Sequence, residues 1–322
     1  MSKKWIALAL KILVSGGLIW LLLGSVDLAA AKAKILAADG YFLAAAAGTA
    51  LLQVIIIIVW RWQAVLRAMD IRIPYVRSLE ITYIGQFFNQ ALPSSIGGDA
   101  VRIYKIYKLG IPLSRAINSV MLDRVATVLG LVALVVIAAP FFMERVGESD
   151  ARWIIPAVSI VTVGGVGGLA MLMILDTLPA RFSRFKFVHA LAVLAADTRR
   201  VFLSPVNLFK VMVISLTGHA NIALATFLIA QSLGLAVTWV DCMVLMPPVL
   251  LLMTLPISIA GWGVREGAMV TAFALIGIPA EGALVLSIML GLIGILISLP
   301  GGLIWLMSGD RNISDIDPKA GL

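Results

Sequence analysis

Charged residues are scarce in this chain of 322 residues, and cysteine is almost absent. Lys, Arg, Asp and Glu make up 13% of the sequence, about half of the roughly 25% found in soluble domains. The one cysteine, Cys242, excludes a disulfide framework within the sequence and a cysteine-based metal site. The sequence also lacks a metal-ligand spacing, a nucleophile elbow and a Walker loop. We therefore predict no metal, no cofactor and no catalytic residues.

Apolar residues dominate instead, at 61% of the sequence with a mean hydropathy of +1.05. Water cannot be the main solvent of such a chain, and a bilayer-spanning helix needs roughly 20 apolar residues. We predict an all-α integral membrane protein with six full transmembrane helices. The first should be a retained anchor rather than a cleaved signal peptide. The six stretches, which meet or approach the required length, are residues 12–24, 41–60, 125–143, 153–175, 211–240 and 283–307.

Membrane topology explains the net charge of +8 better than nucleic acid does, because basic residues separate the apolar stretches. Lys and Arg are enriched in cytoplasmic loops. A cytoplasmic N-terminus places Arg61, Arg67, Arg72 and Arg77 in an internal loop, and later loops keep this bias. We predict a multi-pass protein of the cell inner (plasma) membrane with both termini cytoplasmic. Membrane lipids are the expected partners, and no nucleic acid is expected.

A re-entrant segment is predicted at residues 75–115, because basic loops flank this segment on both sides. Its first part contains Glu80, Gln86, Asn89 and Gln90, which suit packing inside protein better than contact with lipid. The helix should then break at residues 92–99, where a proline removes a backbone donor and paired glycines permit unusual backbone angles. Such a break is tolerated only where it is buried or lines a cavity.

The second half of the chain repeats this break. Residues 255–265 align with residues 92–102 at an offset of 163, and seven of eleven positions are identical. Gly110-Ile111-Pro112 also recurs as Gly277-Ile278-Pro279. Three predicted spans separate the copies, so the second hairpin should enter from the opposite face. We predict an inverted repeat of residues 75–140 and 240–308, an architecture that recurs in transporters. The alternative is independent use of proline and glycine as helix breakers.

The membrane domain is expected to cover residues 1–308. Within it, residues 176–206 place Phe182, Phe185 and Val188 near one helical face with arginines around them. This linker is either an amphipathic helix on the cytoplasmic surface or an ordinary connector. Residues 309–322 are polar and are expected to form a disordered tail.

Three motifs resemble a known membrane family. They are Asn89-x-x-Leu92-Pro93-x-x-x-Gly97-Gly98-Asp99-x-x-Arg102, then Ser119-Val120-x-x-Asp123-Arg124, and then Pro256-x-x-x-x-Gly261-x-Gly263-x-Arg265-Glu266. Their order and spacing resemble the flippase-like transmembrane domain of lysylphosphatidylglycerol synthases, in a standalone form without the aminoacyl-transferase domain. The resemblance implies a lipid-handling membrane domain that moves an anionic phospholipid or a polyprenyl- or hopanoid-type lipid. A separate lipid-modifying transferase is a further partner that the resemblance implies.

Charged side chains beside the breaks are the candidates for function, because charge is costly at bilayer depth. We expect Arg102 and Arg265 to hold a phosphate at the helix N-termini that follow the breaks. In the alternative, Asp99 pairs with Arg102 or Arg124, and Arg265 with Glu266 or Asp123, to neutralise charge that the fold needs. Phosphate binding and ion pairing are compatible, because an internal ion pair that opens for a headgroup would act as a gate. The predicted substrate-binding residues are Asn89, Gly97, Gly98, Asp99, Arg102, Asp123, Arg124, Gly261, Gly263, Arg265 and Glu266.

Other polar and aromatic residues in the apolar stretches are expected to have structural roles. His219 should pack rather than relay protons, and Asn89 should satisfy broken backbone more readily than it binds a headgroup. Tryptophans near span ends are expected to anchor the interface. They are Trp60, Trp62, Trp239 and Trp305.

The sequence thus predicts a flippase-like transporter of a phospholipid or an isoprenoid-linked lipid. The main alternative is a membrane-embedded transferase that uses Asp99, Asp123 or Glu266 as a base. A third reading is a non-catalytic subunit that delivers lipid to a separate transferase.

Overall fold

The computed structural model describes residues 17, 20, 27–92, 97–143, 148–177, 186–254 and 261–308. These residues are helical apart from caps and short connections, and no β-strand occurs among them. The predicted first span, residues 12–24, and the C-terminal tail lie almost wholly or wholly outside these ranges. The central residues of both predicted breaks, 93–96 and 255–260, lie outside them as well.

Four described helical segments are long and apolar enough to cross a bilayer. The first, Gly40–Ala68, is a continuous run of α3 (Gly40–Leu52), the π-helix η1 (Gln53–Ile58) and α4 (Val59–Ala68). The others are α7 (Leu113–Met143), α10 (Pro205–Ser232) and α13 (Ala280–Met307). α8 (Glu148–Met173) contains a shorter apolar helix. Several membrane-spanning helices are therefore confirmed.

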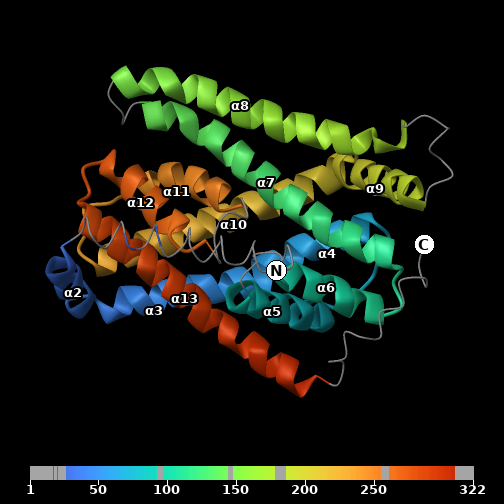
Figure 1. Cartoon of the computed structure of the whole chain (residues 1–322), viewed down its shortest axis with the longest axis horizontal. Coiled ribbons are helices and arrows are strands. Elements are labelled where there is room, and N and C mark those ends of the chain that lie inside the picture. The colour runs from blue at the N-terminus through green and yellow to red at the C-terminus, as the bar shows by residue number, and fades with distance from the viewer. Residues whose placement is uncertain are drawn as a thin grey trace.

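Two pairs of shorter helices are inserted among the long ones. The first pair is α5 (Tyr75–Ala91) with α6 (Gly97–Lys108), and the second is α11 (Trp239–Met253) with α12 (Val264–Ala274). Figure 1 shows the two pairs in opposite halves of the molecule, with α5 and α6 near the end of α4 and α11 and α12 near α2. Each pair packs internally, and the pairs are also crossed, because α5 packs on α13 and α11 packs on α7.

The same turn ends both short pairs. Gly110 follows α6 with φ +83°, and Gly277 follows α12 with φ +78°, a left-handed backbone that favours glycine. Two residues later a proline precedes the long helix, Pro112 before α7 and Pro279 before α13. Proline is suited to a helix start because its missing N–H has no partner there in any case. The repeated Gly-Ile-Pro therefore makes the same structure twice.

The remaining elements lie at the ends and along one side. α2 (Leu28–Leu36) begins after Asp27, whose carboxylate caps the helix by accepting from the N–H of Ala29 at 2.8 Å. A short 3₁₀ turn, η2 (Leu175–Thr177), and α9 (Lys186–Phe202) follow α8. α9 packs against α7, α8 and α4, with Leu194 and Phe202 buried. Phe182 and Phe185 of the predicted amphipathic linker lie outside the described residues.

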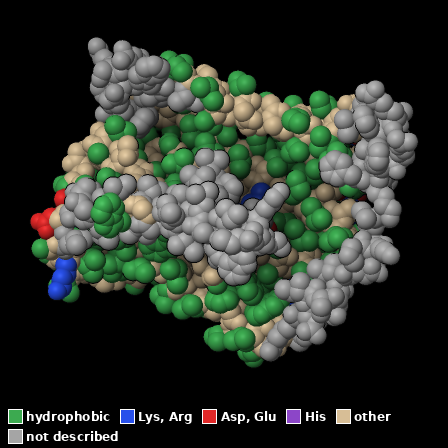
Figure 2. All heavy atoms as spheres, in the orientation of Figure 1, with side chains coloured by type: hydrophobic (Ala, Val, Ile, Leu, Met, Phe, Trp, Pro, Cys, Tyr) green, Lys and Arg blue, Asp and Glu red, His purple; other side chains and the backbone are tan. Residues whose placement is uncertain are grey.

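The buried side chains form two clusters, one in each half. One joins α2, α3 and α10–α13 around Phe273 and Met246, and the other joins α4–α7, α9 and the start of α10 around Trp62 and Ile81. The surface is apolar too: hydrophobic side chains spread over the face shown in Figure 2, and charged ones show mainly at the end where α2 lies. An apolar exterior around a packed core is what a lipid solvent requires.

One helix end and the location of two residues differ from the sequence prediction. The predicted span 211–240 ends at Ser232, because Gly234 takes φ +63° and α11 begins only at Trp239. Arg61 does not lie in a loop, and Trp62 is not an interfacial anchor. Both lie inside α4 and are buried, with Arg61 6% and Trp62 0% exposed.

Candidate functional site

A buried carboxylate on α7 is the centre of the largest charged cluster. Asp123 is 1% exposed and accepts hydrogen bonds from two guanidinium groups. Arg61 of α4 donates through Nε to Oδ1 at 2.8 Å, and Arg102 of α6 donates through Nη2 to Oδ2 at 3.0 Å. The carboxylate therefore joins α4, α6 and α7 in the core of one half.

A second carboxylate extends this cluster. Arg124, the next residue on α7, binds Asp99 of α6 bidentately, with Nε to Oδ2 at 2.8 Å and Nη2 to Oδ1 at 2.9 Å. Arg102 lies between the two acids, with its Nη1 3.6 Å from Asp99 Oδ1. We call these five residues, Arg61, Asp99, Arg102, Asp123 and Arg124, the arginine network.

Among the described residues, the arginine network holds three guanidinium groups and two carboxylates, which gives it a formal charge of +1. Charge buried at bilayer depth is costly unless it is paired. The two acids thus lower the cost of the three cations but do not remove it. One anionic group placed against the network would make it neutral.

Close packing of α5 on α6 fixes the position of the network. A methyl group on Gly98 would lie 1.9 Å from the carbonyl oxygen of Gly85, so only glycine fits there. The Gly98 N–H donates to Asn89 Oδ1 at 3.0 Å, which caps the first turn of α6. This bond is consistent with the expected structural role of Asn89. Arg102 is held from another side by Trp62, whose ring centre lies 4.5 Å from its guanidinium carbon.

A cavity of about 440 Å³ lies beside the network. Asp99 and Arg124 contribute to one wall, and Leu250, Met253 and Thr254 from the end of α11 contribute to another. The cavity therefore lies between the start of α6 and the end of α11, next to both predicted breaks. The side chain of Arg124 is 47% exposed, against 5% for that of Arg102. Arg124 is thus the most accessible guanidinium of the network.

His219 of α10 lines the same cavity. Its Nε2 lies 3.0 Å from the carbonyl oxygen of Thr127, while its Nδ1 is buried with no hydrogen-bond partner among the described residues. The ring packs beside Gly130, where a methyl group would lie 3.2 Å from His219 Nε2. The expected packing role of this histidine is consistent with these contacts.

The second half holds a separate and smaller charged cluster. Arg265 donates through Nη2 to Glu266 Oε1 at 2.7 Å and through Nε to Ser287 Oγ at 3.1 Å. Glu266 also accepts from the Gly263 N–H at 2.6 Å, and Arg265 lies over the ring of Trp262 at 4.6 Å. Arg265 and Glu266 are 6% and 2% exposed. This pair is neutral and enclosed.

The structure brings the predicted residues together in two groups. The first group lies in or beside the arginine network, and two of its members, Asp99 and Arg124, line the cavity; the group is Asn89, Gly97, Gly98, Asp99, Arg102, Asp123 and Arg124. In the second group, Arg265 and Glu266 meet at Ser287, Gly263 bonds to Glu266, and the Gly261 carbonyl accepts from the Arg265 N–H. Arg265 pairs with Glu266, one of the two alternatives, whereas Asp99 lies against both Arg102 and Arg124. Sequence reasoning missed Arg61. Arg61 stands in Trp60-Arg61-Trp62, directly after an apolar run. A buried arginine and a loop arginine look the same at that position, so the sequence alone does not distinguish them.

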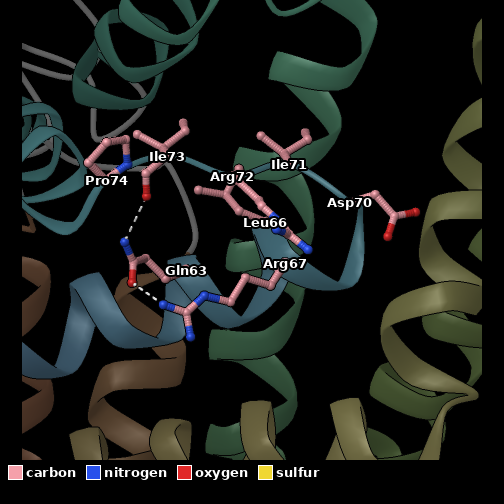
Figure 3. A pocket seen from close by; sticks show the side chains of 8 residues that line it. All are labelled: Gln63, Leu66, Arg67, Asp70, Ile71, Arg72, Ile73 and Pro74. Carbon is pink, nitrogen blue, oxygen red and sulfur yellow. Dashed lines mark hydrogen bonds between the residues drawn. The ribbon is translucent and has the colours of Figure 1, made fainter.

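A larger cavity of about 720 Å³ lies where α4 turns into α5. Figure 3 shows Arg67 turned toward Gln63, whose Oε1 accepts from Arg67 Nη2 at 3.0 Å, and Asp70 directed away from both. Gln63 in turn donates to the carbonyl oxygen of Ile73 at 3.1 Å. These bonds stabilise the connection between the two helices at a basic end of the bundle.

Within the described ranges, no three histidine, cysteine or acidic side chains come close enough to hold a metal ion. Apolar helices long enough to cross a bilayer, a lipid-compatible exterior and buried ion pairs beside a cavity define a multi-pass helical membrane protein.

The family is identified by sequence comparison. The family described as the lysylphosphatidylglycerol synthase TM region matches residues 8–302, and the chain belongs to this family. The resemblance carried by the three motifs is thereby confirmed. A search of curated proteins finds no significant match to the chain.

Proposed function

We propose that this protein is a flippase-like transporter that moves an anionic lipid between the leaflets of the inner membrane. The observation that carries the proposal is the uncompensated positive charge of the arginine network beside a cavity. A phosphodiester has one negative charge, so a single phospholipid or polyprenyl phosphodiester would neutralise the network. The family also concerns a lipid-related membrane region, which supports a lipid as the substrate.

Arg124 is the proposed first contact for the phosphate. Its two donors already form the fork geometry that a phosphate accepts, and Asp99 now occupies that position. A phosphate that enters from the cavity would displace Asp99, which keeps Arg102 as a neighbour at 3.6 Å. The Asp99–Arg124 pair would then act as a gate that opens only for an anion able to replace a carboxylate.

The architecture that we propose is an inverted repeat of two re-entrant hairpins, α5–α6 and α11–α12. Three observations support it: the shared sequence at the two breaks, the identical Gly-Ile-Pro turns, and the crossed packing of α5 on α13 and α11 on α7. Transporters with such repeats bind substrate near the midplane at the repeat interface and open alternately to either side. The basic loops favour a cytoplasmic location for both termini.

The direct test is leaflet exchange in liposomes that contain the purified protein and fluorescent phosphatidylglycerol or polyprenyl phosphodiesters. Wild type should accelerate exchange of the anionic probes over phosphatidylcholine. Arg124→Gln should reduce that exchange at least about tenfold, the effect expected from loss of one charged hydrogen-bonded contact. Arg200→Ala is a matched control, because Arg200 forms an exposed pair with Asp70 away from the network.

Folding must be checked by size-exclusion behaviour and thermal unfolding of each variant in detergent. Arg124→Lys keeps the charge and loses the bidentate geometry, so it should retain part of the activity. No acceleration for any anionic lipid, with or without a proton gradient, would contradict the transport proposal. It would favour the transferase or the partner-subunit alternative.

A further inference from the structure

A second polar cavity adjoins the 440 Å³ cavity that Arg124 lines. Its volume is about 150 Å³, and four amide side chains from three helical segments turn toward it: Gln53 of η1, Gln86 and Gln90 of α5, and Asn221 of α10. Ser298 of α13 adds a hydroxyl, and the rest of the lining is apolar. We call this the amide pocket. Amides inside a membrane helix are costly unless they find partners, so their convergence on one space needs an explanation.

Two of the four amide side chains are hydrogen-bonded to described residues, and two are not. Asn221 Nδ2 donates to the carbonyl oxygen of Thr49 at 2.9 Å and to Gln53 Oε1 at 3.0 Å. Among the described residues, neither the NH₂ group of Gln53 nor the side-chain carbonyl of Asn221 has a hydrogen-bond partner. Gln86 and Gln90 have no hydrogen-bond partner among the described residues, although both line the pocket. The pocket therefore offers both donors and acceptors to a ligand.

The backbone is adapted at this position. Gln53 is the first residue of the π-helix η1 inside an otherwise α-helical span. π-turns are rare and occur often at functional sites, because the extra residue changes the direction of a side chain. On the facing helix, Gly218 leaves room for the amide, since a methyl group there would lie 3.2 Å from Gln53 Nε2. Both features direct Gln53 toward Asn221 and the pocket.

Charge and size restrict the ligand. None of the described residues that line the amide pocket is acidic or basic, so the pocket favours an uncharged group. Amides pair well with hydroxyls because each partner both donates and accepts. At about 30 Å³ per water molecule, the pocket accommodates a group of about five non-hydrogen atoms, the size of a glycerol or of one face of a sugar.

Ile222 lines both this pocket and the 440 Å³ cavity of Arg124, so the two spaces lie on adjoining sides of one turn of α10. We infer that the amide pocket binds the uncharged, hydroxyl-bearing part of a lipid headgroup while the arginine network holds its phosphate. This inference rests on the proposed function, because it takes the ligand of the amide pocket to be the transported lipid. It assigns specificity for the headgroup to Gln53, Gln86, Gln90 and Asn221.

The test uses two lipids that differ only in hydroxyls, phosphatidylglycerol and phosphatidylpropanol, which have the same charge and acyl chains. Binding to purified protein is measured in detergent by native mass spectrometry or by competition. Wild type should prefer phosphatidylglycerol about tenfold, as expected for two new hydrogen bonds. Gln86→Leu combined with Gln90→Leu should abolish the preference by weakening phosphatidylglycerol binding about tenfold.

Gln231→Leu is the matched control, because Gln231 lies near the end of α10 outside the pocket and donates to the Val237 carbonyl oxygen. The control should keep the tenfold preference. Gln90→Met preserves side-chain length and shape, and it serves if the double variant unfolds. A sugar-bearing polyprenyl phosphodiester, compared with its propyl ester, distinguishes an isoprenoid source of the hydroxyls from a glycerolipid. A preference within either pair that depends on Gln86 and Gln90 supports the inference.

Equal binding of both lipids in each pair by wild type would overturn the inference, as would a preference that survives the double variant. The transport proposal fails by a different result. If wild type prefers the hydroxylated lipid but accelerates no exchange, the amide pocket is supported and the transport proposal is contradicted. If exchange is fast, depends on Arg124 and is the same with and without hydroxyls, the transport proposal is supported and the headgroup role of the amide pocket is contradicted.

Discussion

The two pairs of short helices place an arginine at aligned positions of two similar sequences, and the charge of each arginine is compensated in a different way. Arg102 and Arg265 each lie over a tryptophan ring, at 4.5 and 4.6 Å. Arg265 receives its carboxylate from the next residue, Glu266, and the result is neutral and closed. Arg102 receives its carboxylate from α7 and shares it with Arg61, and the result is a larger network with a net positive charge beside a cavity.

The difference shows that two similar motifs can form two different sites. The second cluster stabilises the start of α12, because Glu266 also accepts from the Gly263 N–H. The first cluster does more than stabilise a helix end, since its described members carry one positive charge in excess. Four experiments would break or sharpen this contrast, and they follow from the largest expected effect to the smallest.

Removal of Asp123 should be the most damaging change. Asp123→Asn leaves Arg61 and Arg102 buried without their shared carboxylate, and loss of one partner from a buried ion pair costs about 3–5 kcal/mol. Glu266→Gln should cost less, because the neutral pair becomes singly charged and the amide oxygen still accepts from Gly263. Thermal unfolding of both variants in the same detergent provides the measurement. An equal loss would contradict the contrast between the two clusters.

Arginine substitutions should separate function from stability. Arg124→Gln is expected to lower anionic lipid exchange at least about tenfold with little change in folding, since its side chain is 47% exposed. Arg265→Gln should show the reverse, with reduced stability and exchange that recovers when the folded fraction is taken into account. Liposome exchange normalised to folded protein decides between them. Loss of exchange in Arg265→Gln at full folding would assign substrate contact to the second hairpin.

Substitution of the aligned glycines Gly98 and Gly261 should destabilise the protein for two different reasons. Gly98→Ala places a methyl group 1.9 Å from the Gly85 carbonyl oxygen and must separate α5 from α6, at about 1–3 kcal/mol. Gly261→Ala meets only the flexible end of Met253 but keeps φ +82°, which costs roughly 1–2 kcal/mol for an L-residue. Only Gly98→Ala should also reduce exchange, because Asp99 and Arg102 move with α6. Stability and exchange of the two variants are compared side by side.

An ion pair outside both hairpins should matter least. Arg199 donates to Asp176 and thereby lowers the pKa of that carboxyl, so the pair contributes fully at neutral pH. The contribution is lost as the pH falls through the lowered pKa, below the ordinary carboxyl range. Asp176→Asn should shift the Tm by about 1 °C at pH 7 and by nothing in strong acid. A large shift at neutral pH would show that α9 depends on this contact.

The sequence predicted the helices and the positions of the breaks well. Long apolar runs became helices, and Gly110-Ile111-Pro112 with its copy became helix ends followed by helix starts, because proline and glycine act through local backbone geometry. The ion pair of Asp99 with Arg124, one of the predicted alternatives, is also present. These features depend on residues close in sequence or on a motif of fixed spacing.

Partners far apart in sequence could not be predicted. Arg61 and Asp123 are separated by 62 positions, and nothing local distinguishes a buried arginine at a span end from a cytoplasmic one. The choice of Arg124 over Arg102 as the accessible cation depends on Trp62 and Gly85, which enclose Arg102 from two other helices. The convergence of Gln53 with Gln86 and Gln90 likewise depends on how two segments, η1 and α5, pack.

The crossed packing has a mechanical consequence. A methyl group on Gly301 of α13 would lie 2.1 Å from the carbonyl oxygen of Tyr83 on α5, so the two backbones touch with no side chain between them. A tilt of α5 should therefore carry α13 with it, and α13 in turn is the packing partner of α12. We therefore expect α5 and α13 to move as one body, so that a displacement of the first pair of short helices reaches α12 in the second pair.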